Sequence, residues 1–170
     1  MTSDAPRVRL AIPADADGIA RVHVRSWRET YAGIVPEHLM NAAAEEERRR
    51  MWAAILGLGP VPGVVAVAER DGQVVGFAFA GSSAHPDAVK GVAPSRPVHL
   101  FSLYLLAAEH GAGLGRELLA AVIGDDPAQL WLADSNTRAK AFYERQGFRA
   151  DGAEVDDPEI ADLREIRMVR

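Results

Sequence analysis

Three closely spaced glycines could bind a phosphate group in this 170-residue chain. Gly111, Gly113 and Gly115 follow an apolar stretch typical of a strand and precede the apolar face of a helix that begins at about Leu114. Glycine lets the backbone approach a ligand closely, and the amides at a helix N-terminus favour an anion. The segment is therefore either a pyrophosphate cradle or an ordinary glycine-rich turn, and the spacing alone favours neither.

Two other phosphate-binding motifs do not fit this segment. A P-loop requires Gly-Lys before Ser or Thr, and the chain contains no Gly-Lys pair. A dinucleotide fingerprint requires glycine at its first, third and sixth positions. The sixth position is Arg116 when counted from Gly111 and Leu118 when counted from Gly113. We therefore expect neither a P-loop nor a dinucleotide site here.

A second segment of interest begins at Asn136, 21 residues after Gly115. It reads Asn-Thr-Arg-Ala-Lys-Ala-Phe-Tyr-Glu-Arg-Gln-Gly-Phe. Helical spacing would bring Asn136 and Tyr143 to the same face, and Gly147 is typical of a helix C-terminus. Taken alone, Phe142 and Tyr143 are more often core aromatics. Their order and distance after the glycine turn favour a functional interpretation.

Together, the two segments resemble the hallmark motifs of the GNAT superfamily of acetyl-CoA-dependent N-acetyltransferases. In that family the first motif usually reads Gln/Arg-Gly-x-Gly-x-Gly/Ala, and the second reads Asn-x-x-Ala-x-x-Phe-Tyr-x-x-x-Gly-Phe. The segment Trp27–Pro36 is also similar to one common in bacterial members. The resemblance implies a single N-acetyltransferase domain over residues 1–170. It would transfer the acetyl group of acetyl-CoA to a primary amine without a metal.

The resemblance also implies which residues bind acetyl-CoA. The backbone of Leu103–Leu105 would pair with the pantetheine arm, and an N–H there would polarise the thioester carbonyl. The amides of residues 110–116 would bind the pyrophosphate, with His110 in place of the usual Gln or Arg. The expected cofactor-binding residues are Leu103, Tyr104, Leu105, His110, Gly111, Ala112, Gly113, Leu114, Gly115, Arg116, Asn136 and Tyr143.

Three residues are candidates for the chemical step. By resemblance, Tyr143 would protonate the leaving thiolate after direct attack of the amine on the acetyl carbonyl. A base is needed because an amine with a pKa of about 8–10 is mostly protonated at neutral pH. His99 and Glu29 are the candidate bases, and an ordered water is the alternative.

The elements that would position these residues form an α/β (α+β) fold. We expect a mixed, mostly antiparallel sheet of about six or seven strands flanked by about four helices, the GNAT-like acyl-CoA N-acyltransferase fold. Asp71-Gly72 between two apolar runs predicts a β-hairpin. Ser82–Pro97 is expected to be a long functional or mobile loop. The predicted strands are 7–12, 64–70, 73–80, 99–106, 129–133, 148–155 and 164–170, and the predicted helices start at about residues 14, 36, 114 and 137.

Composition excludes several other classes of protein. The net charge of −5 and the lack of a long basic run argue against nucleic acid as the ligand. The chain has no cysteine, which excludes disulfides, thiolate metal sites and cysteine nucleophiles. Met51–Ala68 lacks charge but is interrupted by Gly57, Gly59, Pro60, Pro62 and Gly63, so it predicts a helix end, a turn and a strand. We expect a cytoplasmic protein that binds no membrane.

The sequence leaves two alternative functions, the acceptor amine and the oligomeric state open. The same fold could serve as a non-catalytic acyl-CoA-binding sensor, or the glycine turn could be incidental in a structural α/β domain. The acceptor amine is unidentified and could belong to a small molecule, a protein N-terminus or a lysine. A homodimer is the commonest assembly for such a chain.

Overall fold

The predicted β-hairpin forms around Asp71 and Gly72. In the computed structural model, which describes residues 5–57 and 62–170, β2 (Gly63–Arg70) and β3 (Gln73–Ser82) flank Asp71 and Gly72. Both turn residues have positive φ, 50° and 74°, as a type I′ turn requires. The hairpin is confirmed. The predicted turn through Gly59 and Pro60 lies outside the described residues.

The chain divides into two compact units, which are described separately. Unit 1 comprises Met1–Phe79 and Ser102–Gly124, and unit 2 comprises Ala80–Phe101 and Asp125–Arg170. The strand order is β1-β2-β3-β4-β5-β7-β6 in a seven-stranded sheet, and strands β3 and β4 contribute residues to both units. The mixed α/β fold with about seven strands is therefore confirmed.

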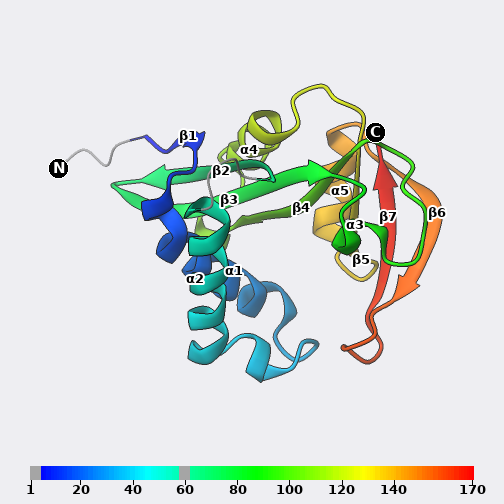
Figure 1. The fold of residues 1–170 in the computed structure, drawn as a ribbon, viewed down its shortest axis with the longest axis horizontal. Coiled ribbons are helices and arrows are strands. Elements are labelled where there is room, and N and C mark those ends of the chain that lie inside the picture. Colours follow the sequence, from blue (N-terminus) through cyan, green and yellow to red (C-terminus); the bar gives the residue numbers. More distant parts are fainter. Residues whose placement is uncertain (1–4, 58–61) are drawn as a thin grey trace. The chain divides into compact units, whose positions relative to one another are not determined.

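Unit 1 packs helices on both faces of its strands (Figure 1). β1 (Arg7–Leu10) pairs antiparallel with β2, and β4 (Val98–Leu105) brings its last four residues to this unit. Side chains alternate along β2: Val65 and Val67 join the core under α1 (Ala16–Tyr31) and α2 (Ala42–Gly57). α4 (Leu114–Val122) covers the opposite face, where it contacts β1 and β2.

The second helix begins later than the sequence predicted. Pro36 precedes a 3₁₀ turn, Glu37–Leu39, and α2 starts only at Ala42. The Asn41 Oδ1 accepts a 2.9 Å hydrogen bond from the Ala44 amide, so Asn41 acts as the N-cap that satisfies an otherwise unpaired helix donor. In the Glu/Arg run that follows, Glu46 pairs on the surface with Arg49 and Arg50.

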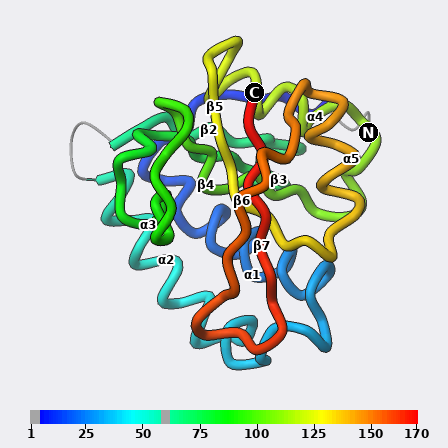
Figure 2. The backbone as a smooth tube through the Cα atoms, turned by 90° about the vertical axis from the view of Figure 1, so that its right-hand side faces the viewer, coloured from blue at the N-terminus to red at the C-terminus, as the bar shows by residue number. Residues whose placement is uncertain are grey.

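In unit 2, β4 pairs in parallel with β5 (Ala128–Ala133). The pairing extends over the first three residues of each strand. β7 (Arg164–Val169) pairs antiparallel with both β5 and β6 (Arg149–Asp156). Figure 2 shows β5, β7 and β6 running alongside one another. α5 (Thr137–Arg145) connects β5 to β6 and is followed by Gly147 with φ 88°, which confirms the predicted helix end.

The long segment 82–97 is held against β5 by buried polar side chains. Gln129 is fully buried, and its Oε1 accepts hydrogen bonds from the amides of Ser95 and Arg96 at 2.7 and 3.1 Å. The Trp131 indole donates to the carbonyl of Ala88. That residue lies in a short helix, α3 (Pro86–Val89), which the sequence did not predict. Pro86 at its first position and one hydrogen bond from Asp87 to the His85 ring start this single turn.

Candidate active site

The glycine turn follows the end of β4 directly, as the sequence predicted. The Leu106 amide still donates to the Val75 carbonyl at 3.0 Å, which extends the pairing of β4 with β3. A 3₁₀ turn, Ala107–Glu109, then reverses the chain before α4 begins at Leu114. The strand end, the turn and the helix N-terminus all lie in unit 1.

The turn presents unpaired backbone amides at the N-terminus of α4. Gly111 and Gly113 have φ values of 86° and 84°, a region that costs L residues roughly 1–2 kcal/mol. The Gly113 carbonyl accepts hydrogen bonds from Arg116 and Glu117. Within the described part of the chain, the amides of Gly111, Ala112 and Gly113 donate to no backbone carbonyl, and these three residues are exposed. The arrangement can therefore bind an anion through its N–H groups.

Two ion-paired or hydrogen-bonded carboxylates hold this turn in place. The Glu109 side chain is buried and forms a two-point ion pair with Arg70 at the end of β2, with N···O distances of 3.0 and 2.8 Å. On the other side, the Glu29 Oε2 accepts a 2.8 Å hydrogen bond from the Ala107 amide. The sequence analysis missed Arg70 and Glu109, because the two residues are 39 positions apart and no local pattern pairs them.

The His110 side chain contacts the backbone at the end of β4. Its Nε2 lies 3.1 Å from the Leu105 carbonyl oxygen, a distance at which the Nε2–H tautomer donates a hydrogen bond. The Tyr104 ring packs inward, stacked on His23 with ring centroids 5.1 Å apart. The Tyr104 side chain therefore packs against the core of unit 1.

The backbone of β4 is packed closely against β3 at this point. A Cβ added at Gly76 of β3 would lie 2.3 Å from the Leu105 Cδ2 and 3.0 Å from the Tyr104 carbonyl oxygen. Only glycine leaves room for this approach. Gly76 therefore fixes the position of the strand that was predicted to bind the cofactor arm.

The two candidate bases lie in different surroundings. Glu29 is on α1 in unit 1, where its second oxygen accepts a hydrogen bond from Arg25 Nε at 3.1 Å. His99 is in unit 2, only 3% exposed, with Nδ1 3.4 Å from the Gln129 Nε2. Burial, together with the positive charges of Lys90 and Arg167, lowers the pKa of His99 to about 4. The His99 ring is therefore neutral at pH 7 and weakly basic.

Asn136 and Tyr143 occupy the α5 segment of unit 2. The Asn136 Oδ1 accepts a 3.0 Å hydrogen bond from the Ala139 amide and so caps the helix. The Tyr143 ring is 7% exposed and packs edge-to-face against Phe142 and Phe148. The second motif therefore contributes both a helix cap and an aromatic cluster to the fold.

The predicted residues fall into two sets. Unit 1 holds Glu29, Leu103–Leu105 and residues 110–116, whereas unit 2 holds His99, Asn136 and Tyr143. Among the residues that the structure describes, no three His, Asp or Glu side chains are grouped to hold a metal ion. No helix within 5–57 or 62–170 has the length and apolar character needed to cross a membrane.

The sequence matches a known protein family and two sequence relatives. The acetyltransferase (GNAT) family model matches residues 23–148, which include the glycine turn and the Asn136–Phe148 segment. A protein named "Probable N-acetyltransferase" from Mycobacterium tuberculosis is 27% identical over 150 residues, covering 86% of this chain and 81% of its own. The uncharacterized N-acetyltransferase YuaI of Bacillus subtilis is 29% identical over 163 residues, covering 92% and 87%.

Solved structures share the fold. The PaiA N-acetyltransferase of Thermoplasma acidophilum, solved in complex with coenzyme A, superposes with a TM-score of 0.71 at 17% identity, covering 98% of this chain and 99% of its own. Together with the family match, this likeness confirms the resemblance drawn from the two motifs, the fold class and the predicted N-acetyltransferase class. The chain belongs to the acetyltransferase (GNAT) family.

Proposed function

We propose that this protein transfers the acetyl group of acetyl-CoA to a primary amine, and that the amides of residues 110–116 bind the pyrophosphate. One observation carries the proposal: exposed, unpaired amides of Gly111–Gly113 gather at the N-terminus of α4 within the family-matched region. Two solved relatives support the choice of ligand. PaiA is described with coenzyme A, and YncA of Salmonella typhimurium, 21% identical with a TM-score of 0.68, is described with acetyl-CoA.

The proposed role of His110 is to support the strand, not to contact phosphate. Its ring lies 3.1 Å from the Leu105 carbonyl, whereas Arg70 and Glu29 hold the two ends of the 3₁₀ turn through Glu109 and Ala107. These contacts fix the turn before a ligand arrives, which lowers the ordering cost of binding. The backbone of Leu103–Leu105 would pair with the pantetheine arm, and an N–H there would stabilise the oxyanion.

The chemical step we propose is direct attack without a covalent enzyme intermediate. Acetyl-CoA supplies an activated acyl group as a thioester. The acceptor nitrogen forms a bond to the acetyl carbon, and the C–S bond breaks. Glu29 accepts the proton lost by the amine, directly or through water, because its carboxylate lies at the start of the turn, whereas the His99 side chain is buried. Tyr143 gives a proton to the leaving sulfur, and Asn136 contacts the CoA arm.

A substitution in the glycine turn tests the proposal. Gly113→Asp places a carboxylate and a strained backbone where the pyrophosphate would bind, so acetyl-CoA binding measured by calorimetry should be abolished. Gly152→Asp is the matched control, because Gly152 in β6 also has a positive φ (91°) and open space around it. The control variant should bind acetyl-CoA as the wild type does. Retained binding in Gly113→Asp, or equal loss in both variants, would reject the pyrophosphate site.

A thiol-release assay tests turnover. The wild-type protein, given acetyl-CoA and a panel of primary amines, should release free CoA in step with acetylated amine. Binding of acetyl-CoA with no release for any amine would contradict the transferase proposal and indicate a non-catalytic binding protein.

A further inference from the structure

Five buried side-chain atoms on α1 and α2 have no hydrogen-bond partner within the described chain. They lie on facing sides of the two helices at helical spacing, positions i, i+3 and i+4 on α1 and i and i+4 on α2. Buried polar groups are paired in more than about 90% of cases, so a local group of five calls for an explanation. The atoms are His23 Nδ1, Ser26 Oγ, Trp27 Nε1, Arg48 Nε and Trp52 Nε1.

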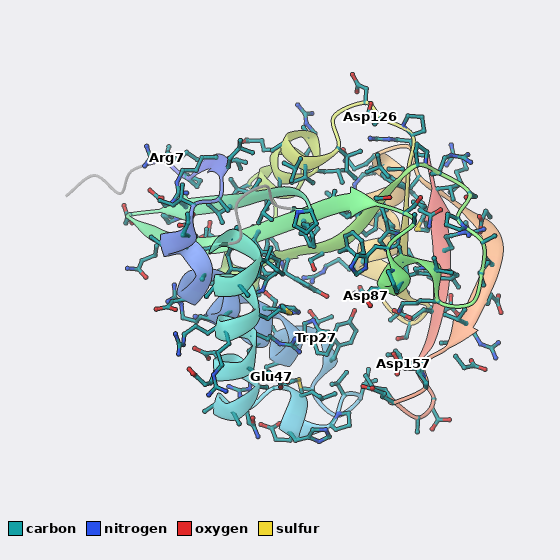
Figure 3. All side chains as sticks on the ribbon, viewed as in Figure 1. Arg7, Trp27, Glu47, Asp87, Asp126 and Asp157 are labelled. Carbon is teal, nitrogen blue, oxygen red and sulfur yellow. The ribbon has the colours of Figure 1, made fainter. Side chains whose placement is uncertain are left out.

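Ring contacts, one of them through Phe77, join four of these side chains in unit 1, and Ser26 is next to Trp27 in the sequence of α1. The Arg48 guanidinium lies over the Trp27 ring, 4.8 Å from its centroid. His23 contacts Trp27 at 5.7 Å and Phe77 at 5.5 Å, and Trp52 contacts Phe77 at 5.2 Å. Figure 3 labels Trp27 on α1 and Glu47, the neighbour of Arg48, on α2. We call His23, Ser26, Trp27, Arg48 and Trp52 the donor cluster.

The chemistry of the donor cluster specifies what its missing partner must be. The indole N–H groups of Trp27 and Trp52 and the Nε–H of Arg48 can only donate hydrogen bonds. A buried donor left unpaired costs the full desolvation penalty of the group. A partner for these atoms must therefore supply oxygen acceptors. An ammonium group, which can only donate hydrogen bonds, would not satisfy them.

The charge of the donor cluster is positive. Arg48 Nη2 reaches the Leu39 carbonyl at 3.5 Å, but no carboxylate among the described residues forms an ion pair with Arg48. Its neighbour Arg49, by contrast, pairs with Glu46 at 2.6 Å. Burial lowers the pKa of His23 to about 3, so its ring is neutral and offers one N–H and one lone pair. An anionic oxygen ligand would compensate the guanidinium.

The donor cluster adjoins the elements assigned to the reaction. His23 stacks on Tyr104, the central residue of the strand segment proposed to bind the pantetheine arm. Ser26 lies on α1 one helical turn before Glu29, the proposed base. Both links are within unit 1. A ligand held by the donor cluster would therefore lie beside the acetyl-transfer chemistry.

We propose that the acceptor is an amine that also carries a carboxylate, and that Arg48, with Trp27 and Ser26, binds this carboxylate. A planar guanidinium with neighbouring N–H donors suits a carboxylate better than any neutral group. The inference rests on the proposed acetyl transfer and names the substrate class of that same site. Amino acids and peptides with a nearby carboxyl group are the expected acceptors, and amines without one are poor substrates.

Steady-state kinetics with paired acceptors test this inference. Each pair consists of an amino-carboxylic acid and its carboxamide, over a series of chain lengths between nitrogen and carboxyl group. For the accepted lengths, kcat/KM should be about 10- to 100-fold higher for the acid, the factor expected of a charged hydrogen bond. Arg48→Met should abolish this preference through a higher KM for the acid, while acetyl-CoA affinity stays unchanged.

Two further variants keep the test decisive. Arg49→Met, which changes the adjacent surface arginine, should retain the full preference. Trp27→Phe keeps an aromatic ring but removes the indole N–H, and it should reduce the preference. This variant provides the test if Arg48→Met fails to fold. Equal kcat/KM for acids and carboxamides in the wild type, or an unchanged ratio in Trp27→Phe and a folded Arg48→Met, would overturn the inference. A wild-type protein that binds acetyl-CoA but acetylates no amino-carboxylic acid would also overturn the inference.

Failure of the inference is distinguishable from failure of the proposed function. If the enzyme acetylates amines that lack a carboxylate equally well, acetyl transfer stands and the acceptor class is wrong. If the wild type neither binds acetyl-CoA nor releases thiol with any amine, the proposed function itself fails, and the inference fails with it.

Discussion

The Glu29 Oε2 accepts a 2.8 Å hydrogen bond from the Ala107 amide. This contact joins helix α1 to the first residue of the 3₁₀ turn, 78 positions further along the chain. Glu29 therefore has two separable properties, since it holds the start of the turn and it carries a carboxylate able to accept a proton. Substitutions that keep one property and remove the other show which of them the reaction requires.

Glu29→Gln should separate positioning from base catalysis. The glutamine Oε1 can still accept the hydrogen bond from Ala107, so the Kd for acetyl-CoA by calorimetry should change little. Loss of the carboxylate removes the proton acceptor, which lowers kcat by about 10²- to 10⁴-fold. Glu29→Ala removes both properties and should also weaken acetyl-CoA binding. A Glu29→Gln enzyme with wild-type kcat would show that Glu29 only positions the turn, and another base would be required.

Arg70→Met should loosen the glycine turn and weaken acetyl-CoA binding. The substitution leaves the buried Glu109 carboxylate without its ion-pair partner, and breaking such a pair on one side typically costs about 3–5 kcal/mol when both charges are buried. Because the Arg70 side chain is one-third exposed, we expect a smaller loss of stability. Thermal unfolding measures that loss, and calorimetry measures the Kd.

Arg7→Met provides the control for Arg70. Arg7 also pairs with a glutamate, Glu69, but its side chain is 70% exposed, and exposed ion pairs contribute about 0–1 kcal/mol. This variant should retain wild-type stability and acetyl-CoA affinity. Equal effects of the two substitutions would contradict a specific role of the Arg70–Glu109 pair in the turn.

Tyr143→Phe tests the proposed proton donor without disturbing the aromatic cluster. Phenylalanine keeps the ring that packs against Phe142 and Phe148, so the thermal unfolding midpoint should stay close to that of the wild type. Without the hydroxyl group the leaving thiolate lacks its acid, and kcat should fall while the Kd for acetyl-CoA is nearly unchanged. Unaltered turnover would reject the general-acid role of Tyr143.

The buried His99 predicts how stability depends on pH. Burial lowers its pKa in the folded state to about 4, below the ordinary value of 6.5. Between these values the unfolded chain binds more protons than the folded one, so stability falls as the pH decreases from about 6.5 to about 4. Urea unfolding of the wild type and His99→Gln at several pH values measures this. The variant should lose less stability on acidification.

A core substitution without a titrating group provides the comparison for His99→Gln. Phe148 is fully buried in the same unit, and Phe148→Leu should lower the free energy of unfolding by a similar amount at every pH. If His99→Gln retains the full wild-type loss on acidification, His99 does not set this part of the pH dependence. His23, whose pKa is lowered by burial to about 3, then becomes the group to substitute.

The sequence by itself determined the elements that local chemistry specifies. Asp71-Gly72 required a type I′ hairpin because both positions need positive φ, and Gly147 ended α5 for the same reason. The alternating glycines after β4 predicted a turn that leads into a helix at about Leu114. Each of these depends on a few adjacent residues, and each was confirmed.

Only the tertiary structure showed which distant residues act together. Glu109 forms an ion pair with Arg70, 39 positions away in the sequence, and Glu29 accepts a hydrogen bond from Ala107, 78 positions away. His99, a plausible base in the sequence, has its pKa lowered because the fold buries it near Lys90 and Arg167. Of the donor cluster of α1 and α2, only Trp27 lies in a segment that the sequence singled out by its resemblance to the family. Burial, charge pairing and unmet hydrogen bonds depend on what surrounds a side chain, and that environment exists only after the chain has folded.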